Sequence, residues 1–166
     1  MSMGDHIAVM HQGVIQQIGS PEDLYNHPVN RLVAGMIGSP SMNFVPGTYE
    51  VAGSEAMLKC AAFKVNLTKF KPVIDKESSS SELIFGIRPE HIKVDHKKLS
   101  PDSVEGTVVL EEALGSESIL HVNVDGTLLK AIVPPTFETI YGEKVWLGFH
   151  TDSIHILDGK TEKLIV

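Results

Sequence analysis

SILHVNVDGTLLKAIV, residues 118–133, carries the clearest structural signal in this sequence. Leu120, Val122 and Val124 alternate with polar residues, and this period of two is typical of a β-strand with one buried face. Asp125-Gly126 follows directly, and an Asp-Gly pair between two apolar runs predicts a tight hairpin turn. Residues 127–133 are the expected return strand. The stretch therefore predicts an antiparallel β-hairpin.

Similar runs recur on both sides of this hairpin at short intervals. Asp158-Gly159 marks another hairpin turn. We expect residues 114–118 to form a turn that connects two strands. Residues 75–82, with four consecutive serines, predict a mobile loop. Many short strands separated by turns favour small antiparallel barrels over a parallel sheet, so we predict a mainly β fold. The further expected strands are residues 44–51, 57–67, 83–88, 104–110, 144–149, 153–157 and 163–166.

The first 40 residues follow a different pattern. Residues 6–19 read as a hairpin that turns at residues 11–13. Ser20 is a good helix N-cap, Pro21 suits the first helical position, and Asp23 lies where a capping acid reaches back. A second short helix is expected over residues 30–37.

Composition limits the functional classes. The chain has 166 residues, of which 42% are hydrophobic, and a formal net charge of −7. This favours a packed core and argues against nucleic acid or an anionic membrane as a partner. Cys60 is the only cysteine, so no intrachain disulfide can form. Neither a signal-peptide pattern nor an apolar run long enough to span a membrane occurs, and we expect a cytoplasmic setting.

The sequence lacks the motifs of common catalytic sites. It contains no P-loop string, and neither Gly-x-Ser-x-Gly nor His-Glu-x-x-His occurs. Its histidine pairs, 91 with 96 and 150 with 155, are five residues apart, which on a strand points the two rings to opposite faces. We therefore predict no catalytic, cofactor-binding or metal-binding residues in this chain, and that it is not an enzyme.

Several strings resemble the ATP-binding subunit of sugar-importing ABC transporters of the maltose and multiple-sugar type. GDHIAVM at residues 4–10, GVIQQIG at 13–19 and PEDLY at 21–25 are similar to the last stretch of the ATPase domain, although His6 replaces a common arginine. Residues 31–44 resemble the passage into the regulatory domain. GIRPEH at residues 86–91, residues 111–115 and 119–122, and residues 148–149 and 154–159 are similar to strings of that domain.

The resemblance implies a definite architecture and role. Residues 1–40 would be the end of the ATPase domain and a linker, and residues 41–166 a TOBE-type domain of OB-like β-barrels. That domain would regulate the subunit and help two subunits to dimerise. The parent subunit would use ATP and Mg²⁺ to drive carbohydrate import, on the cytoplasmic face of the membrane. Its partners would be membrane permease subunits, a solute-binding protein and a regulatory protein.

Binding residues concentrate on loops held by rigid barrels, which suggests two regulatory contacts. They are Arg88, Glu90 and His91 in one segment, and Ser116 and Glu117 in the other. The structural alternative is that Arg88 and Glu90 brace the end of a strand that Pro89 stops. The functional alternative is a domain that senses a small oxyanion or sugar, but its cations are scattered along the sequence (Lys59, Lys64, Lys69, Lys71 and Arg88).

Apolar residues near the N-terminus predict self-association. Without an ATPase core to pack on, they would be exposed and would seek another chain. They are Ile7, Val9, Val14 and Ile18 of the hairpin and Leu24, Leu32, Val33 and Met36 of the helices.

The absence of a P-loop gives the first testable prediction. Phosphoryl transfer needs positioned phosphate and Mg²⁺ contacts. We therefore expect calorimetric titration of this chain with ATP and Mg²⁺ to show no saturable binding. Micromolar binding that depends on Mg²⁺ would contradict the expectation.

Overall fold

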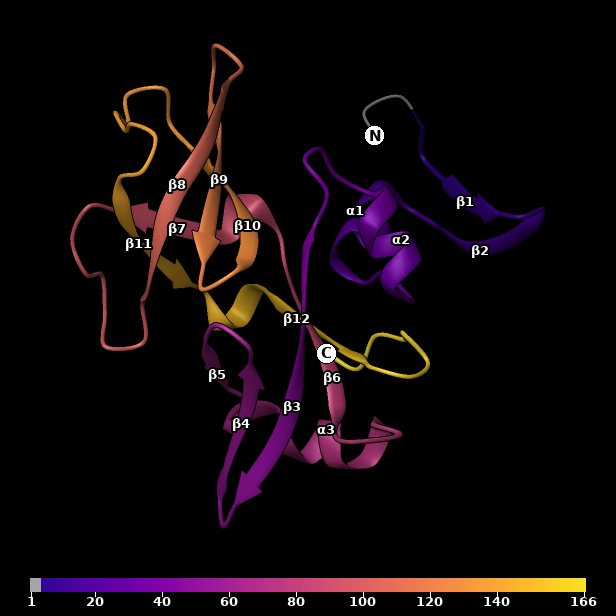
Figure 1. Ribbon diagram of the computed structural model, residues 1–166. Coiled ribbons are helices and arrows are strands. Elements are labelled where there is room, and N and C mark those ends of the chain that lie inside the picture. The colour runs from indigo at the N-terminus through magenta and orange to yellow at the C-terminus, as the bar shows by residue number, and fades with distance from the viewer. Residues whose placement is uncertain (1–3) are drawn as a thin grey trace.

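The protein consists of two antiparallel sheets with a small helical unit at the N-terminal end (Figure 1). The structure is a computed structural model that describes residues 4–166. Both sheets have five strands, and a separate two-stranded hairpin precedes them. The mainly β fold with OB-like barrels is therefore confirmed. No helix within the described residues is long and apolar enough to cross a membrane.

The N-terminal unit follows the pattern that the sequence predicts. Strands β1 (Ile7–His11) and β2 (Val14–Gly19) form the hairpin, and Gln12 and Gly13 turn it with φ angles of 49° and 79°. Helix α1 (Pro21–Asn26) begins where the Ser20 hydroxyl accepts a 3.1 Å hydrogen bond from the backbone N–H of Asp23. Helix α2 (Arg31–Met36) has the Asn30 side chain as its N-cap.

Burial in this unit differs in part from the expectation. Leu24 and Val33 are fully buried and pack with Val9 and Ile37 in a small core of their own, so the two helices cover each other and the hairpin. The prediction that Val9, Leu24 and Val33 would be exposed was therefore wrong. The large apolar residues that remain exposed are Met10, Val14, Ile15, Ile18, Val29 and Met36.

The first sheet has the strand order β12-β6-β3-β4-β5. Its strands are β3 (Asn43–Ala52), β4 (Glu55–Cys60), β5 (Lys64–Asn66), β6 (Glu82–Ile87) and β12 (Ile154–Asp158). The prediction of a single strand over residues 57–67 was wrong. The chain turns after Cys60, whose N–H donates to the Phe63 carbonyl at 2.9 Å, and β5 folds back onto β4.

The second sheet has the order β10-β9-β8-β11-β7. Its strands are β7 (Ile92–Asp95), β8 (Val104–Ala113), β9 (Ser118–Val124), β10 (Thr127–Val133) and β11 (Lys144–Phe149). Asp125 and Gly126 have φ angles of 43° and 87°, which confirms the expected turn between β9 and β10. The edge strands β10 and β7 also contact each other, so the sheet curls into a half-barrel.

The loop predicted over residues 75–82 is confirmed only for residues 78–81, which lack regular secondary structure. Helix α3 (Lys71–Glu77) occupies its first part, and Ser79 is fixed to Asp158 of β12. The Asp158 carboxylate accepts hydrogen bonds from the Ser79 N–H at 2.6 Å and the Ser79 hydroxyl at 2.8 Å. Residues 163–166 do not form a regular strand, although their backbone bonds to β12.

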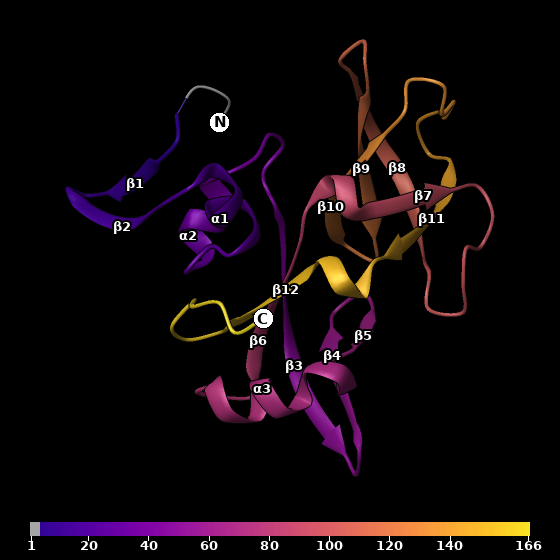
Figure 2. The same cartoon turned by 180° about the vertical axis from the view of Figure 1, so that it is seen from behind.

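One hydrophobic core joins the two sheets. The rings of Phe85 from β6 and Phe63 from the turn between β4 and β5 meet that of Phe149 from β11, with centroids 5.0–5.6 Å apart. The chain itself also returns to the first sheet, because it leaves the second sheet after β11 and forms β12, which pairs with β6 (Figure 2). The two sheets therefore form one body.

Asn43 links the sheets by hydrogen bonds. Its amide nitrogen donates to the carbonyls of Ile87 at 3.2 Å and Lys130 at 2.9 Å, and its amide oxygen accepts from the Lys130 N–H at 2.8 Å. The residue is 8% exposed. It acts as a buried bridge from β3 to β10.

We expect Asn43→Ala to lower the free energy of unfolding by about 2 kcal/mol, because it leaves buried backbone groups unpaired. Urea denaturation of the chain measures this. Asn123→Ala is the matched control, since the exposed Asn123 side chain bonds only within its own turn and should cost less than about 1 kcal/mol. Equal losses would contradict the bridging role.

Candidate functional site: the Arg88 corner and the cleft between the sheets

Arg88 stands at the end of β6, where the N-terminal unit meets the first sheet. Its side chain is 1% exposed. The two terminal guanidinium nitrogens donate to the carbonyls of Ile37 at 2.7 Å and Tyr25 at 2.6 Å. The guanidinium carbon also lies 3.7 Å from the centroid of the Tyr25 ring. One side chain thus contacts the C-terminal ends of α1 and α2.

These contacts meet a general need of helix ends. The last carbonyls of a helix have no partner within the helix and carry a partial negative charge. The planar fork of an arginine matches two such acceptors. Gly38 leaves room for it, since a Cβ there would lie 2.9 Å from the Arg88 Nη1 atom. Burial lowers the pKa of Arg88 to about 10, which still leaves it charged at neutral pH.

His155 and His91 lie beside this guanidinium. The Nε2–H of His155 donates to the Asn26 carbonyl at 3.2 Å. Its Nδ1 atom, the Nδ1 of His91 and the Nε of Arg88 are buried without a hydrogen-bond partner among the described residues. Burial first, and then the charges of Arg88, His91 and His27, hold the pKa of His155 below its ordinary value. Protonation would place an unpaired charge beside Arg88.

The residues predicted as regulatory contacts lie in two separate places. Arg88 is internal and no partner reaches it in this conformation, whereas Glu90 is exposed and His91 half-buried. Ser116 and Glu117 lie at the tip of the β8–β9 hairpin, which projects from the second sheet (Figure 1). Ser116 is exposed there and Glu117 is half-buried. The predicted turn over residues 114–118 is confirmed by the hydrogen bond from the Leu114 N–H to the Glu117 carbonyl at 2.9 Å.

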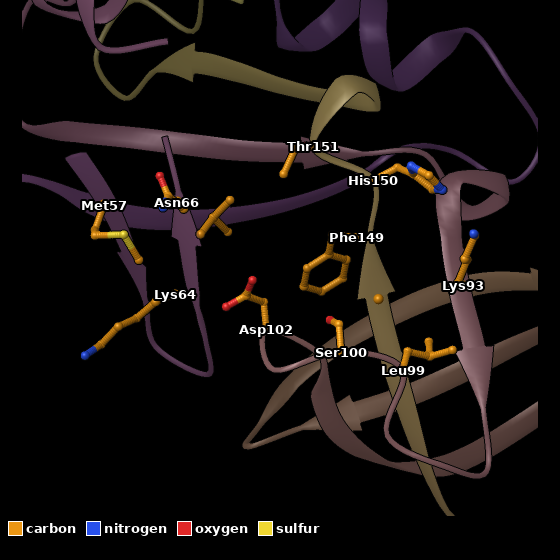
Figure 3. Close-up of a pocket in the computed structure, with 12 residues that line it drawn as sticks. Met57, Lys64, Asn66, Lys93, Leu99, Ser100, Asp102, Phe149, His150 and Thr151 are labelled. Carbon is orange, nitrogen blue, oxygen red and sulfur yellow. The ribbon is translucent and has the colours of Figure 1, made fainter. Parts of the chain in front are cut away.

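A cleft of about 580 Å³ opens where the two sheets meet (Figure 3). It lies between the edge strand β5 of the first sheet and the β7–β8 loop and β11 of the second. Sequence reasoning missed it because its lining comes from four separate segments. Its main polar and apolar side chains are Lys64, Asn66, Lys93, Asp102, Phe149 and His150. Within residues 4–166, no three His, Cys, Asp or Glu residues are grouped to hold a metal ion.

Comparison with known families identifies the class of protein. Residues 38–92 match the MalK OB fold domain and residues 85–157 match the TOBE domain, so the two matches together cover residues 38–157. The chain belongs to the TOBE and MalK-type OB-fold segments of ABC transporter ATP-binding proteins.

Individual relatives agree with this class. The chain is 34% identical over 99% of its length to an uncharacterised ABC transporter ATP-binding protein, YurJ, of Bacillus subtilis, and covers 46% of it. It is 35% identical over 99% of its length to the trehalose/maltose import ATP-binding protein MalK of Thermococcus litoralis, and covers 45% of it. The chain therefore spans about half the length of these relatives.

A solved structure shares the fold. The cytoplasmic molybdate-binding protein ModG superposes with a TM-score of 0.52 at 13% sequence identity, over 69% of this chain and 94% of ModG. At this identity the likeness concerns the fold alone.

We expect Arg88→Ala to lower the free energy of unfolding by about 3–5 kcal/mol, because it unpairs two helix ends and leaves a void. Arg88→Lys should cost less, since an ammonium can still reach one carbonyl. Arg31 is the only other arginine in the chain, and its exposed pair with Glu162 makes Arg31→Ala a control that costs less than about 1 kcal/mol. If urea denaturation showed equal losses in the free energy of unfolding for Arg31→Ala and Arg88→Ala, it would contradict the role of Arg88 at the helix ends.

The environment of His155 predicts a pH dependence. Because its pKa is lowered on folding, the native chain binds fewer protons than the unfolded chain below pH ~6.5, so stability falls as the pH drops through that value. The slope should approach ~1.4 kcal/mol per pH unit for one proton. Urea denaturation between pH 5 and 8 measures it. His155→Gln should flatten the profile, whereas the exposed His11→Gln should not.

Proposed function

We propose that this chain is the regulatory and dimerisation module of the ATP-binding subunit of a sugar-importing ABC transporter. The longer subunit would bind ATP and Mg²⁺. It would work with the permease subunits and the solute-binding protein, and it would lie on the cytoplasmic face of the membrane. The residues of this chain would supply no catalytic group. Its task would be to transmit a signal and to hold two subunits together.

The Arg88 corner is the observation that carries the regulatory part. The segment before residue 38 resembles the end of an ATPase domain, and Arg88 bonds two of its helix ends to the first sheet. Arg31 adds an exposed ion pair to Glu162 near the C-terminus. A displacement of the barrels would therefore move the end of the ATPase domain with it. This coupling is what a regulatory module needs.

Two apolar surfaces are candidates for subunit contacts. The first, the hairpin surface, consists of Met10, Val14, Ile15 and Ile18, each 51–61% exposed. In the longer subunit the ATPase domain would cover it. The other candidate lies on the second sheet.

The second candidate, the distal surface, consists of Leu110, Leu114, Ile140 and Tyr141, which are 50–81% exposed. A hydrogen bond from the Gly142 N–H to the Val108 carbonyl at 2.8 Å holds residues 140–142 beside β8. Burying a large apolar side chain is worth about 1.5–3 kcal/mol, and exposed apolar patches of this kind commonly mark interfaces. We assign the dimer contact to the distal surface, which the ATPase domain would leave free.

Light-scattering chromatography at micromolar concentration tests this assignment. Ile15→Lys/Ile18→Lys first removes the competing hairpin surface, and this variant should remain a dimer. Adding Tyr141→Glu should then produce a monomer, because a carboxylate would be desolvated in the contact. Tyr141 is 81% exposed, so folding should be unaffected.

Two outcomes would contradict the proposal. A monomeric wild-type chain would remove the dimerisation role. A dimer lost in Ile15→Lys/Ile18→Lys alone would place the contact on the hairpin.

A further inference from the structure

We propose that the cleft between the two sheets binds a small phosphorylated sugar, or a polyol phosphate of the same chemistry. Most of the residues that line the cleft lie outside the strings that resemble the family's regulatory domain. The binding itself stands on the geometry of the cleft. Only its regulatory consequence rests on the function proposed above.

The size and position of the cleft suit a small metabolite. Its volume of about 580 Å³ is within the usual range for small-molecule sites, roughly 300–1,000 Å³. Met57, Val65 and Asn66 line it from the first sheet, and Leu99 and Phe149 line it from the second. A ligand there would touch both sheets and would favour one arrangement of the two.

The apolar part of the lining is rigid. Phe149 packs against Phe63 and Phe85 in the common core, and Val65 is 5% exposed. Gly148 lets Leu99 pack closely on β11, because a Cβ there would lie 3.1 Å from the Leu99 side chain and 3.8 Å from that of Lys93. These groups offer a surface for the C–H face of a sugar ring.

Polar side chains around the opening have unused hydrogen-bonding capacity. Asn66 accepts a bond from the Thr68 N–H at 2.9 Å, which leaves its amide N–H groups free. Among the hydrogen bonds of residues 4–166, none involves the side chains of Ser100, Asp102 or Thr151, although all three border the same opening (Figure 3). A carboxylate accepts from sugar hydroxyls, while hydroxyl and amide groups can donate to them.

Charge selects an anionic ligand. Five lysines of the chain are engaged in ion pairs with carboxylates (Lys59, Lys69, Lys71, Lys76 and Lys144). Lys64 and Lys93 are among the seven lysines that form no ion pair with any described residue, and these two flank the cleft on opposite sides (Figure 3). The cleft is thus locally positive in a chain with a net charge of −7, and such a field attracts anions.

The phosphate position follows from strand register. Lys93 of β7 pairs with Gly148 of β11, and His150 follows the end of β11 in an extended conformation, which directs its side chain to the same side as residue 148. The Lys93 ammonium and the His150 ring would hold the phosphate. The polyol would then extend toward Ser100, Asp102 and Asn66. This arrangement requires a ligand that carries both a phosphate and a polyol.

Calorimetric titration with glucose 6-phosphate as the probe tests the proposal, with glucose and inorganic phosphate titrated separately. We expect saturable binding of glucose 6-phosphate, and at least about tenfold weaker binding of either part alone. Lys93→Gln should weaken binding about tenfold or more. Lys97→Gln removes the same charge from the same region without lining the cleft, and should leave the affinity unchanged.

Three outcomes would overturn the proposal. They are no saturable binding of glucose 6-phosphate at low-millimolar concentration, equal weakening by Lys93→Gln and Lys97→Gln, and phosphate alone binding as tightly as the sugar phosphate. The Tyr141→Glu chain should bind the probe normally. A wild-type chain that binds the probe but is monomeric would therefore count against the proposed function alone.

Discussion

The guanidinium of Arg88 is the contact on which the arrangement of this chain depends. Two short helices end at the same place, and their last carbonyls would face the first sheet unpaired without it. A buried charge is tolerated only when it has good partners, and here the partners are two backbone oxygens and the face of Tyr25. The N-terminal unit is thereby attached to the barrels by directed bonds.

The same constraint connects the fold to the proposed role. β12 returns to the first sheet, the Phe63, Phe85 and Phe149 rings fill one core, and Asn43 bridges β3 to β10. The body has three places where a signal could enter: the cleft between the sheets, the projecting β8–β9 tip and the distal apolar surface. All three lie on the same body as the corner where Arg88 binds the helix ends. A regulatory module of an ATPase subunit needs such a connection.

Local chemistry made much of the fold predictable. The Asp125-Gly126 turn, the Ser20 N-cap and the period-two strands are encoded within a few residues, and all appear as expected. The anchoring of Ser79 depends on Asp158, 79 residues away in sequence. The break after Cys60 is a local turn closed by Phe63, which the apolar run over residues 57–67 concealed. The site could likewise be predicted only in part. The string at residues 86–91 located the corner, but only the fold shows that Arg88 faces inward and that a cleft forms from four segments.

Amide hydrogen exchange tests the central claim most directly, because it compares the opening of the helical unit with that of the barrels. The amides of Ala34 and Ile37 bond within α2, and that of Phe85 lies in β6. If Arg88 couples the two parts, Ala34 and Ile37 should approach the protection of Phe85 in the wild-type chain. Arg88→Lys should reduce their protection about tenfold or more, with less effect on Phe85. Fast exchange of Ala34 and Ile37 in the wild type, unchanged by Arg88→Lys, would contradict the account.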